Sequence, residues 1–176
     1  MQKCVALLAL LFCVVTISAA QQDKSKRPSP PAQAQCKFSD GKTITIDYSS
    51  PRMRGRKIFG GLVPYGQVWR AGANEATTFV VDTAVTVGDK DVPAGSYTLF
   101  AVPNPEKWTL IISKKTGEWG VPYPEGEDFA RTDMSAGKTQ AAVENFTIGF
   151  DQAGGKCTLH LDWENTRASV DIVEKK

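Results

Sequence analysis

The sequence predicts an all-β fold: a single antiparallel β-sandwich, jelly-roll-like or immunoglobulin-like, with little or no helix. Three observations carry this prediction. Apolar and polar residues alternate along many short segments, clusters of glycine and proline separate those segments, and no window shows a clear helical period. The chain has 176 residues, which suits one domain rather than two. We place that domain over residues 36–173.

The predicted strands follow one another at short intervals. Alternation is clearest over 43–48, 77–81, 97–102, 108–113, 145–150, 157–163 and 170–172. Residues 127–134 are the best candidate for a helix, but the segment is short, and we predict a strand there too. Turn residues separate the strands at 88–90, 93–95, 103–107 and 154–155. Many short strands at such spacing are typical of a sandwich or a barrel.

The first 20 residues have the pattern of a secretory signal peptide. Lys3 supplies a positive charge, residues 5–17 are almost wholly apolar, and Ser18 and Ala20 are the small residues of a cleavage site. The apolar run is shorter than the roughly 20 residues that span a bilayer, so we expect cleavage rather than anchoring. The mature chain is then predicted to be exported, to the periplasm or the extracellular space, without a membrane span.

Residues 21–35 are predicted to be a flexible linker rich in proline and glutamine. They contain no aromatic residue and no aliphatic residue larger than alanine. Such a segment cannot bury enough apolar surface to offset the entropy lost on ordering. Pro28, Pro30 and Pro31 are expected to stiffen its middle.

Cleavage after Ala20 would leave two cysteines, Cys36 and Cys157, each at the start of a predicted strand. In an oxidising compartment such a pair favours a disulfide over two buried free thiols. Closing so long a loop stabilises a fold by up to about 4–5 kcal/mol in the chain-entropy model. We therefore predict a Cys36–Cys157 bridge.

Charge and histidine content exclude several kinds of function. The 21 Lys and Arg residues nearly balance the 19 Asp and Glu residues, so charge gives no indication of nucleic-acid binding. The single histidine, His160, removes sites that need two, including most catalytic zinc sites. We expect no metal and no cofactor. His160 lies in the middle of a predicted strand and is expected to face outward, as a surface residue.

Three arginines, Arg52, Arg54 and Arg56, alternate along one segment. In an extended chain they point to the same side, since side chains alternate. Three guanidinium groups on one face can receive an anionic ligand such as a phosphate, sulfate or uronate. The alternative is a solvated edge strand whose charges prevent edge-to-edge pairing.

A polar and aromatic segment surrounds Gly72 in a predicted loop between strands. Trp69 can stack on a sugar ring while Arg70, Asn74 and Glu75 bind its hydroxyl groups, because loops on a rigid scaffold often carry binding residues. In the structural alternative Arg70 pairs with Glu75, Asn74 caps a turn, and Trp69 fills the core.

A second loop, rich in glycine and proline, carries Trp119 and Tyr123. Exposed aromatic residues on loops mark binding surfaces. The alternative is a lid that closes one end of the sandwich.

The residues suggest a non-catalytic binding module for a glycan, another polymer, an anionic ligand or a protein partner. The alternative is a small hydrolase that uses carboxylates centred on Glu75. Other acids that could complete a carboxylate pair are Asp47, Glu118, Asp162 and Glu164. Sequence spacing does not show that any two of them meet, so we assign no catalytic residue.

One long segment, SPRMRGRKIFGGLVPYGQVWRAGANEAT at residues 50–77, is distinctive. With VPAGSYTLF at 92–100, WTLI at 108–111, TGEWG at 116–120 and ENFTI at 144–148, it resembles the exported bacterial family catalogued as domain of unknown function 2911. The resemblance covers nearly all of residues 36–173. It implies an exported β-sandwich protein and implies no reaction.

Overall fold

The computed structural model describes residues 23–176, so the predicted signal peptide lies outside the described residues. The described chain contains one short 3₁₀ turn, η1 (Lys24–Lys26), and nine strands. The strands are β1 (Pro31–Lys37), β2 (Thr43–Ser49), β3 (Thr77–Val81), β4 (Val85–Val87), β5 (Lys90–Val92), β6 (Gly95–Val102), β7 (Lys107–Ser113), β8 (Asp128–Ala153) and β9 (Lys156–Glu174). The predicted all-β class is confirmed, as is the strand predicted over 127–134.

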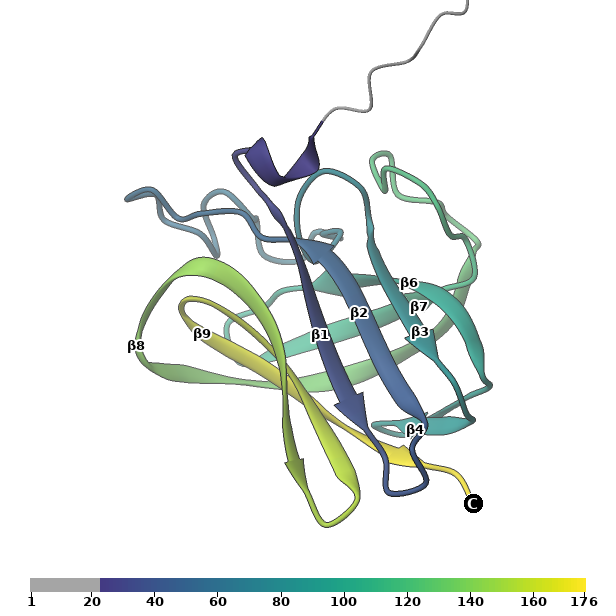
Figure 1. The fold of residues 1–176 in the computed structure, drawn as a ribbon. Coiled ribbons are helices and arrows are strands. Elements are labelled where there is room, and N and C mark those ends of the chain that lie inside the picture. Colours follow the sequence, from purple (N-terminus) through teal and green to yellow (C-terminus); the bar gives the residue numbers. More distant parts are fainter. Residues whose placement is uncertain (1–22) are drawn as a thin grey trace, which may run out of the picture.

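All neighbouring strands are antiparallel, in the order β1-β2-β3-β6-β7-β8-β9-β4-β5. They form one continuous hydrogen-bonded sheet rather than two separate ones. Figure 1 shows that this sheet folds over itself, with β1, β2 and β3 in front of β6 and β7. The long strands β8 and β9 continue from one side of the fold to the other.

The hairpin of β8 and β9 bends because its register shifts twice, between Lys138 and Val143 and again before Thr147. Extra residues in one strand of a pair bend that strand and increase its twist. The bend brings the second half of β8 against β1 and against the segment that follows β2. There the backbone N–H of Phe146 donates to the carbonyl of Pro51 at 2.8 Å.

The folded sheet encloses an apolar core. Its largest fully buried side chains are Trp108, Trp163, Phe79, Phe146, Ile44, Ile46, Ile58, Leu99, Leu110 and Ile112, whereas Phe100 and Ile111 form a small second core with Ala76. The predicted disulfide is present and joins Cys36 in β1 to Cys157 in β9, with Cα atoms 6.2 Å apart. Within residues 23–176 we find no helix of sufficient length and hydropathy to cross a membrane.

The linker prediction needs correction for its last five residues. Pro31–Gln35 belong to β1 and pair residue by residue with β2, from Pro31 opposite Ser49 to Gln35 opposite Thr45. Backbone hydrogen bonds to β2 hold the segment, and Ala34 is small enough to be buried while the glutamines face solvent. The amino-acid composition of the segment shows that it lacks large apolar side chains, but it does not show that its backbone pairs with β2.

Candidate functional site

Loops from distant parts of the chain meet at one end of the sheet, at the top of Figure 1. The segment between β2 and β3 is tied to the rest by backbone bonds: Trp69 exchanges two with Ala101 at 2.8 Å, and Ala76 donates to Glu118 at 3.0 Å. Between the loops lies a cleft of about 370 Å³. We call it the loop-end cleft. Its lining residues are Ser29, Pro51, Arg56, Leu62, Val63, Val68, Trp69, Arg70, Gly72, Ala73, Gly120, Val121 and Trp163.

Two tryptophans line the cleft from the side of the core. The rings of Trp69 and Trp163 are stacked, with centroids 5.9 Å apart and planes 20° apart. Both belong to an aromatic cluster with Phe59, Trp108 and Phe146. Trp69 is fixed further by its indole N–H, which donates to the carbonyl of Gly72 at 3.1 Å. Trp69 therefore packs against the core, as the structural alternative predicts, and it also lines the cleft.

Two glutamates at the β8–β9 bend position the loop that follows β2. A carboxylate oxygen of Glu144 accepts from the backbone N–H of Arg54 at 2.9 Å. The carboxylate of Glu164 accepts from the N–H groups of Ile58 and Phe59 at 3.3 and 3.4 Å. These bonds use the carboxylates for backbone support rather than for a reaction. Sequence reasoning missed this role, because the partners lie about a hundred residues apart.

The prediction that Arg52, Arg54 and Arg56 share one face is wrong. The chain turns at Arg54, where φ is 50°, so the segment is not extended. Arg52 binds the side chain of Asn145 at 2.9 Å, whereas Arg56 folds back and donates to the carbonyls of Met53 and Arg52 at 3.0 and 2.7 Å. Of the three arginines, Arg56 is the one that lines the cleft.

Arg70 lies at the cleft with Trp119 as its neighbour. Its guanidinium carbon is 5.3 Å from the centroid of the Trp119 ring, and it donates to the Trp119 carbonyl at 3.2 Å. The loop comes this close because residue 120 is glycine: an added Cβ there would lie 2.9 Å from the Cβ of Ala76 and 3.3 Å from that of Arg70. Burial lowers the pKa of Arg70. Trp119 remains 52% exposed.

Arg70 does not pair with Glu75. The Glu75 carboxylate instead binds Arg27 at 2.7 Å and Lys24 at 3.1 Å. The amide of Asn74, a residue with φ of 56°, donates to the carbonyl of Ser29 at 2.9 Å. Residues 74 and 75 thus hold the N-terminal arm, residues 23–30, and Ser29 in that arm forms one edge of the cleft.

The pKa of Glu75 falls to about 2, chiefly through a hydrogen bond from its own backbone N–H and through the bond from Arg27. Glu75 shares a smaller cleft of about 180 Å³ with Asp47. The Asp47 carboxylate accepts from the Gln33 amide at 2.7 Å. Each carboxylate of this pair is therefore already bound by neighbouring side chains.

Tyr123 is half-buried and contributes to a small second core rather than to the cleft. Its ring packs edge-on against Phe100, with centroids 5.0 Å apart, and its hydroxyl donates to Asp128. Burial and the neighbouring carboxylate raise the pKa of Tyr123 to about 12. These contacts of Tyr123 agree with the alternative to a binding surface, a loop that packs over one end of the fold.

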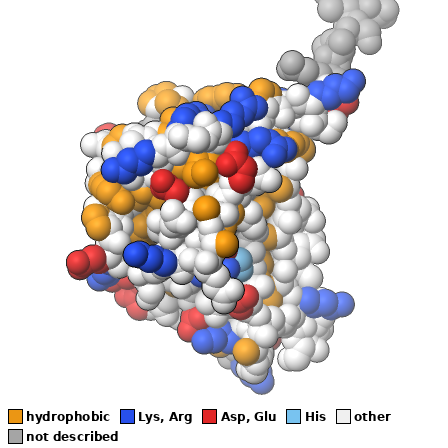
Figure 2. All heavy atoms as spheres, turned by 90° about the vertical axis from the view of Figure 1, so that its left-hand side faces the viewer, with side chains coloured by type: hydrophobic (Ala, Val, Ile, Leu, Met, Phe, Trp, Pro, Cys, Tyr) orange, Lys and Arg blue, Asp and Glu red, His pale blue; other side chains and the backbone are white. Residues whose placement is uncertain are grey.

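Exposed apolar side chains concentrate around the cleft. Seven large hydrophobic residues are exposed among those described, and five of them are on the loops that form this end: Leu62, Tyr65, Val68, Trp119 and Val121. Figure 2 shows hydrophobic side chains gathered with lysine and arginine side chains at the corresponding upper end. An apolar patch with a polar rim marks an interaction site in many proteins.

Unusual backbone conformations gather at the same end. The described non-glycine residues with positive φ are Arg54, Ala71, Asn74 and Glu164, and each lies within two residues of a cleft-lining residue. Such conformations cost about 1–3 kcal/mol each and concentrate at binding sites in other proteins. They persist here because the surrounding hydrogen bonds fix the loops.

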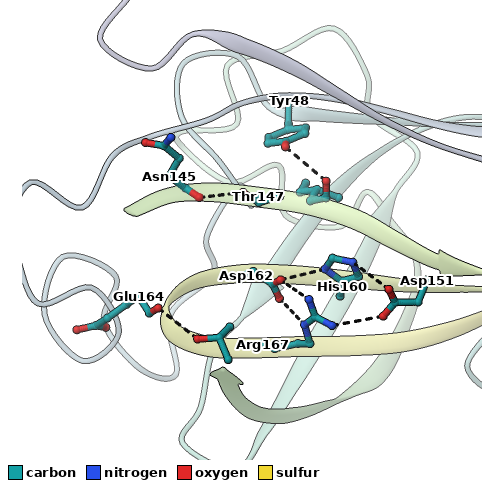
Figure 3. A network of polar contacts seen from close by, with 10 residues as sticks. Tyr48, Asn145, Thr147, Asp151, His160, Asp162, Glu164 and Arg167 are labelled. Carbon is teal, nitrogen blue, oxygen red and sulfur yellow. Dashed lines mark hydrogen bonds and ion pairs between the residues drawn. The ribbon is translucent and has the colours of Figure 1, made fainter. Parts of the chain in front are cut away.

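The hairpin of β8 and β9 carries a second polar cluster, which we call the hairpin network: Asp151, His160, Asp162 and Arg167 (Figure 3). Arg167 donates two hydrogen bonds to Asp162, at 2.8 and 2.6 Å, and lies 3.3 Å from Asp151. The Nδ1 atom of His160 is 3.2 Å from Asp162 but is not aligned for a hydrogen bond. Burial raises the pKa of Asp162, yet the nearby imidazole of His160 and the hydrogen bonds and charge of Arg167 outweigh burial, so the pKa is lowered overall.

The expectation that His160 is an outward surface residue is wrong, because His160 is buried. It lies over Gly149, its partner in β8, where an added Cβ would be 2.6 Å from the imidazole ring. The absence of a side chain at residue 149 makes room for the ring. The sequence contains both Gly149 and His160, but it does not show that they face each other unless the register of β8 and β9 is known.

A larger groove, of about 690 Å³, lies elsewhere and is mostly polar. Three of its four charged side chains are already paired, Lys107 with Asp133 at 2.7 Å and Asp171 with Lys156 at 2.8 Å; the fourth is Glu106. None of the exposed large hydrophobic residues lines it. Over residues 23–176 we find no group of three His, Cys, Asp or Glu side chains arranged to hold a metal ion.

These features define an all-β protein with an apolar, arginine-flanked cleft at its loop end. The chain belongs to the family described as "Protein of unknown function (DUF2911)", whose model matches residues 29–172. The match begins within the N-terminal arm and ends in β9. Comparison with curated proteins and with solved structures gives no match.

Proposed function

We propose that this chain is an exported, non-catalytic binding module whose ligand occupies the loop-end cleft. The observation that carries the proposal is the gathering of exposed apolar side chains around a cleft built by loops on a rigid sheet. The cleft volume, about 370 Å³, is within the range of small-ligand sites. Its stacked tryptophans are held in place before any ligand arrives.

Export is supported by the leader pattern of the first 20 residues and by the Cys36–Cys157 disulfide. The test is the intact mass of the protein recovered from outside the cytoplasm. Export predicts a chain that begins at Gln21 and is two hydrogens lighter than its reduced form. Export is contradicted if the recovered chain still begins at residue 1, or if Cys36 and Cys157 are both free thiols.

A hydrolase centred on Glu75 is less well supported by the geometry. A glycosidase pair needs one carboxylic acid that stays protonated near neutral pH. Glu75, with a pKa of about 2, is ionised and therefore does not supply that acid, and Arg27 and Lys24 already bind the oxygens that a nucleophile or base would use. A turnover that disappears in Glu75→Gln would favour the hydrolase over the binding module.

The binding test is a thermal-shift screen of glycans, peptides and small organic acids against the purified protein. Hits are then measured with Trp119→Ala and Val121→Ser, which alter the exposed rim of the cleft. The matched control is Val173→Ser, at an exposed valine of β9 that does not line the cleft. Loss of binding in the first two variants and not in the control supports the proposal. Equal binding in all three variants contradicts it.

A further inference from the structure

The geometry points to an amphipathic carboxylate of small-molecule size as the ligand of the loop-end cleft, with its apolar body against Trp69 and the exposed apolar rim and its anionic group beside Arg56 and Arg70. This inference rests on the proposed function and narrows it to one ligand class.

The first argument is the charge of the cleft wall. Arg56 and Arg70 line it, and no aspartate or glutamate does. The N-terminal arm engages the carboxylate of Glu75, and backbone N–H groups engage Glu144 and Glu164. Glu118, next to Trp119, has a buried carboxylate oxygen without a hydrogen-bond partner in the described chain, but it does not line the cleft and forms no ion pair with either arginine. Among the described residues neither guanidinium forms an ion pair; each donates to main-chain carbonyls instead. The wall therefore presents uncompensated positive charge.

Second, Arg70 is partly buried and, within residues 23–176, has no carboxylate paired with its guanidinium group. Its burial lowers its pKa, and no acidic side chain offsets that effect. Arg131 and Arg167 differ, since the hydrogen bonds that they donate to Asp128 and Asp162 raise their pKa values. A partly desolvated guanidinium without an anion gains more from binding one than a fully hydrated guanidinium does. Its planar donors match the two oxygens of a carboxylate.

The third argument is the apolar remainder of the wall. The exposed part of this apolar surface comes from Leu62, Val68 and Val121, and the half-buried Trp69 adds to it. Burying an alkyl or aryl group against such a surface contributes about 0.8 kcal/mol per CH₂ group. A neutral sugar would leave both guanidinium groups without an anion, and a cation would be repelled. The combination of apolar surface and unpaired arginines favours a ligand with an apolar part and one negative charge.

The test uses three probes with the same chain length: octanoate, 1-octanol and octylammonium. Calorimetric titration of the full protein at neutral pH is expected to show octanoate binding roughly 10- to 100-fold more tightly than octanol, as for hydrogen bonds between charged groups. Octylammonium is expected to bind more weakly than octanol. Equal affinity for octanoate and octanol overturns the inference, as does absence of binding by all three.

Variants then assign the effect to the cleft. Arg70→Gln and Arg56→Gln should reduce octanoate affinity to about that of octanol while leaving octanol affinity unchanged, which also shows that the cleft is intact. Val121→Glu, which adds an acid at the rim, should weaken octanoate and strengthen octylammonium. Lys57→Gln is the matched control, because it removes one positive charge beside Arg56 but outside the lining residues. Octanoate binding that is indifferent to Arg70→Gln overturns the inference.

The outcomes separate this inference from the proposed function. If octanol and octanoate bind equally and both lose affinity in Trp119→Ala, the carboxylate inference fails. The proposed binding cleft is then retained without selectivity for charge. Tighter binding of a neutral oligosaccharide, with maltopentaose as the probe, overturns the carboxylate and retains the binding module. Failure of the proposed function itself would appear as indifference of every hit to the Trp119 and Val121 variants.

Discussion

Arg167 and Arg70 illustrate two opposite uses of the same side chain. In the hairpin network Arg167 donates two bonds to the buried Asp162 and lies beside Asp151, so its charge is neutralised within the protein. At the loop-end cleft Arg70 rests on Trp119 and binds a carbonyl, and within residues 23–176 it forms no ion pair. The charge of Arg167 is therefore used within the fold, whereas the charge of Arg70 is the one that the proposed function assigns to a ligand.

The same contrast holds for the apolar residues. The β8–β9 hairpin turns Phe146, Leu159, Leu161 and Trp163 into the core, where they are at most 1% exposed. The loop end leaves Trp119 and Val121 more than half exposed. Exposed apolar surface contributes little to folding, and its concentration on well-fixed loops is an observation that supports the proposed binding cleft.

The largest effect is expected from removing the covalent tie between β1 and the hairpin. The Cys36→Ser, Cys157→Ser double variant frees a loop with a sequence separation of 121 residues. The chain-entropy model gives a loss of about 4–5 kcal/mol in the free energy of unfolding. Urea denaturation of both proteins under non-reducing conditions measures it. A loss below about 1 kcal/mol would show that the disulfide does not stabilise this side of the fold.

A smaller loss is expected from Asp162→Asn, which removes the carboxylate that Arg167 binds. Breaking a buried pair costs about 3–5 kcal/mol. Arg167 is 40% exposed and regains some hydration, so we expect about 2–3 kcal/mol here. Thermal melts at pH 7 check the value, with Asp133→Asn, whose Lys107 pair is exposed, as the control.

Acid should remove the same contribution. The folded pKa of Asp162 lies below its unfolded value, so its stabilisation is present above about pH 4 and is lost as the pH falls through the folded pKa. The difference in melting temperature between wild type and Asp162→Asn should therefore shrink as the pH falls below about 4. A difference that stays constant down to pH 2 would contradict this assignment.

A still smaller loss of global stability is expected from Glu75→Gln, which removes the anchor of the N-terminal arm. The Glu75 carboxylate is 43% exposed, and exposed pairs contribute about 0–1 kcal/mol. The local effect should be larger: trypsin should cut faster after Lys24 and Lys26 once the arm is released. The matched control is Asp40→Asn, which breaks an exposed pair with Lys42 far from the arm in sequence. Unchanged cutting in Glu75→Gln would show that the arm does not depend on this contact.

Trp119→Ala is expected to have a similarly small effect on stability and a large effect on binding. The ring is half exposed, and its cation–π contact with Arg70 contributes about 0.5–1 kcal/mol at such a site. The melting temperature should therefore fall by no more than about 4 °C, while ligand affinity at the cleft is lost. A large drop in stability with full retention of binding would assign Trp119 to the fold.

Alternation along the chain predicts most of the longer β-strands, because half-buried strands require it, but it missed the short strands β4 and β5. The disulfide was predicted correctly on a different basis, the two cysteines that remain in an exported chain. Contacts set by register or by distant partners were not predictable. His160 is buried because its partner in the neighbouring strand is Gly149, which has no side chain to occupy the space of the ring. Glu75 binds Arg27, 48 residues away, rather than Arg70. The turn at Arg54 separates arginines that an extended chain would align. Trp69 and Arg70 were placed in a candidate site because their residue types suggested one, and the cleft now brings them together with Arg56.

The central claim is that Arg167 serves the fold and Arg70 serves a ligand, and the same substitution at both positions tests it most directly. Urea unfolding of Arg167→Gln and Arg70→Gln, measured side by side without ligand, compares them. The account predicts a loss of about 2–3 kcal/mol for Arg167→Gln, which leaves Asp162 buried without its partner, and at most about 1 kcal/mol for Arg70→Gln. Equal losses, or a larger loss for Arg70→Gln, would contradict it.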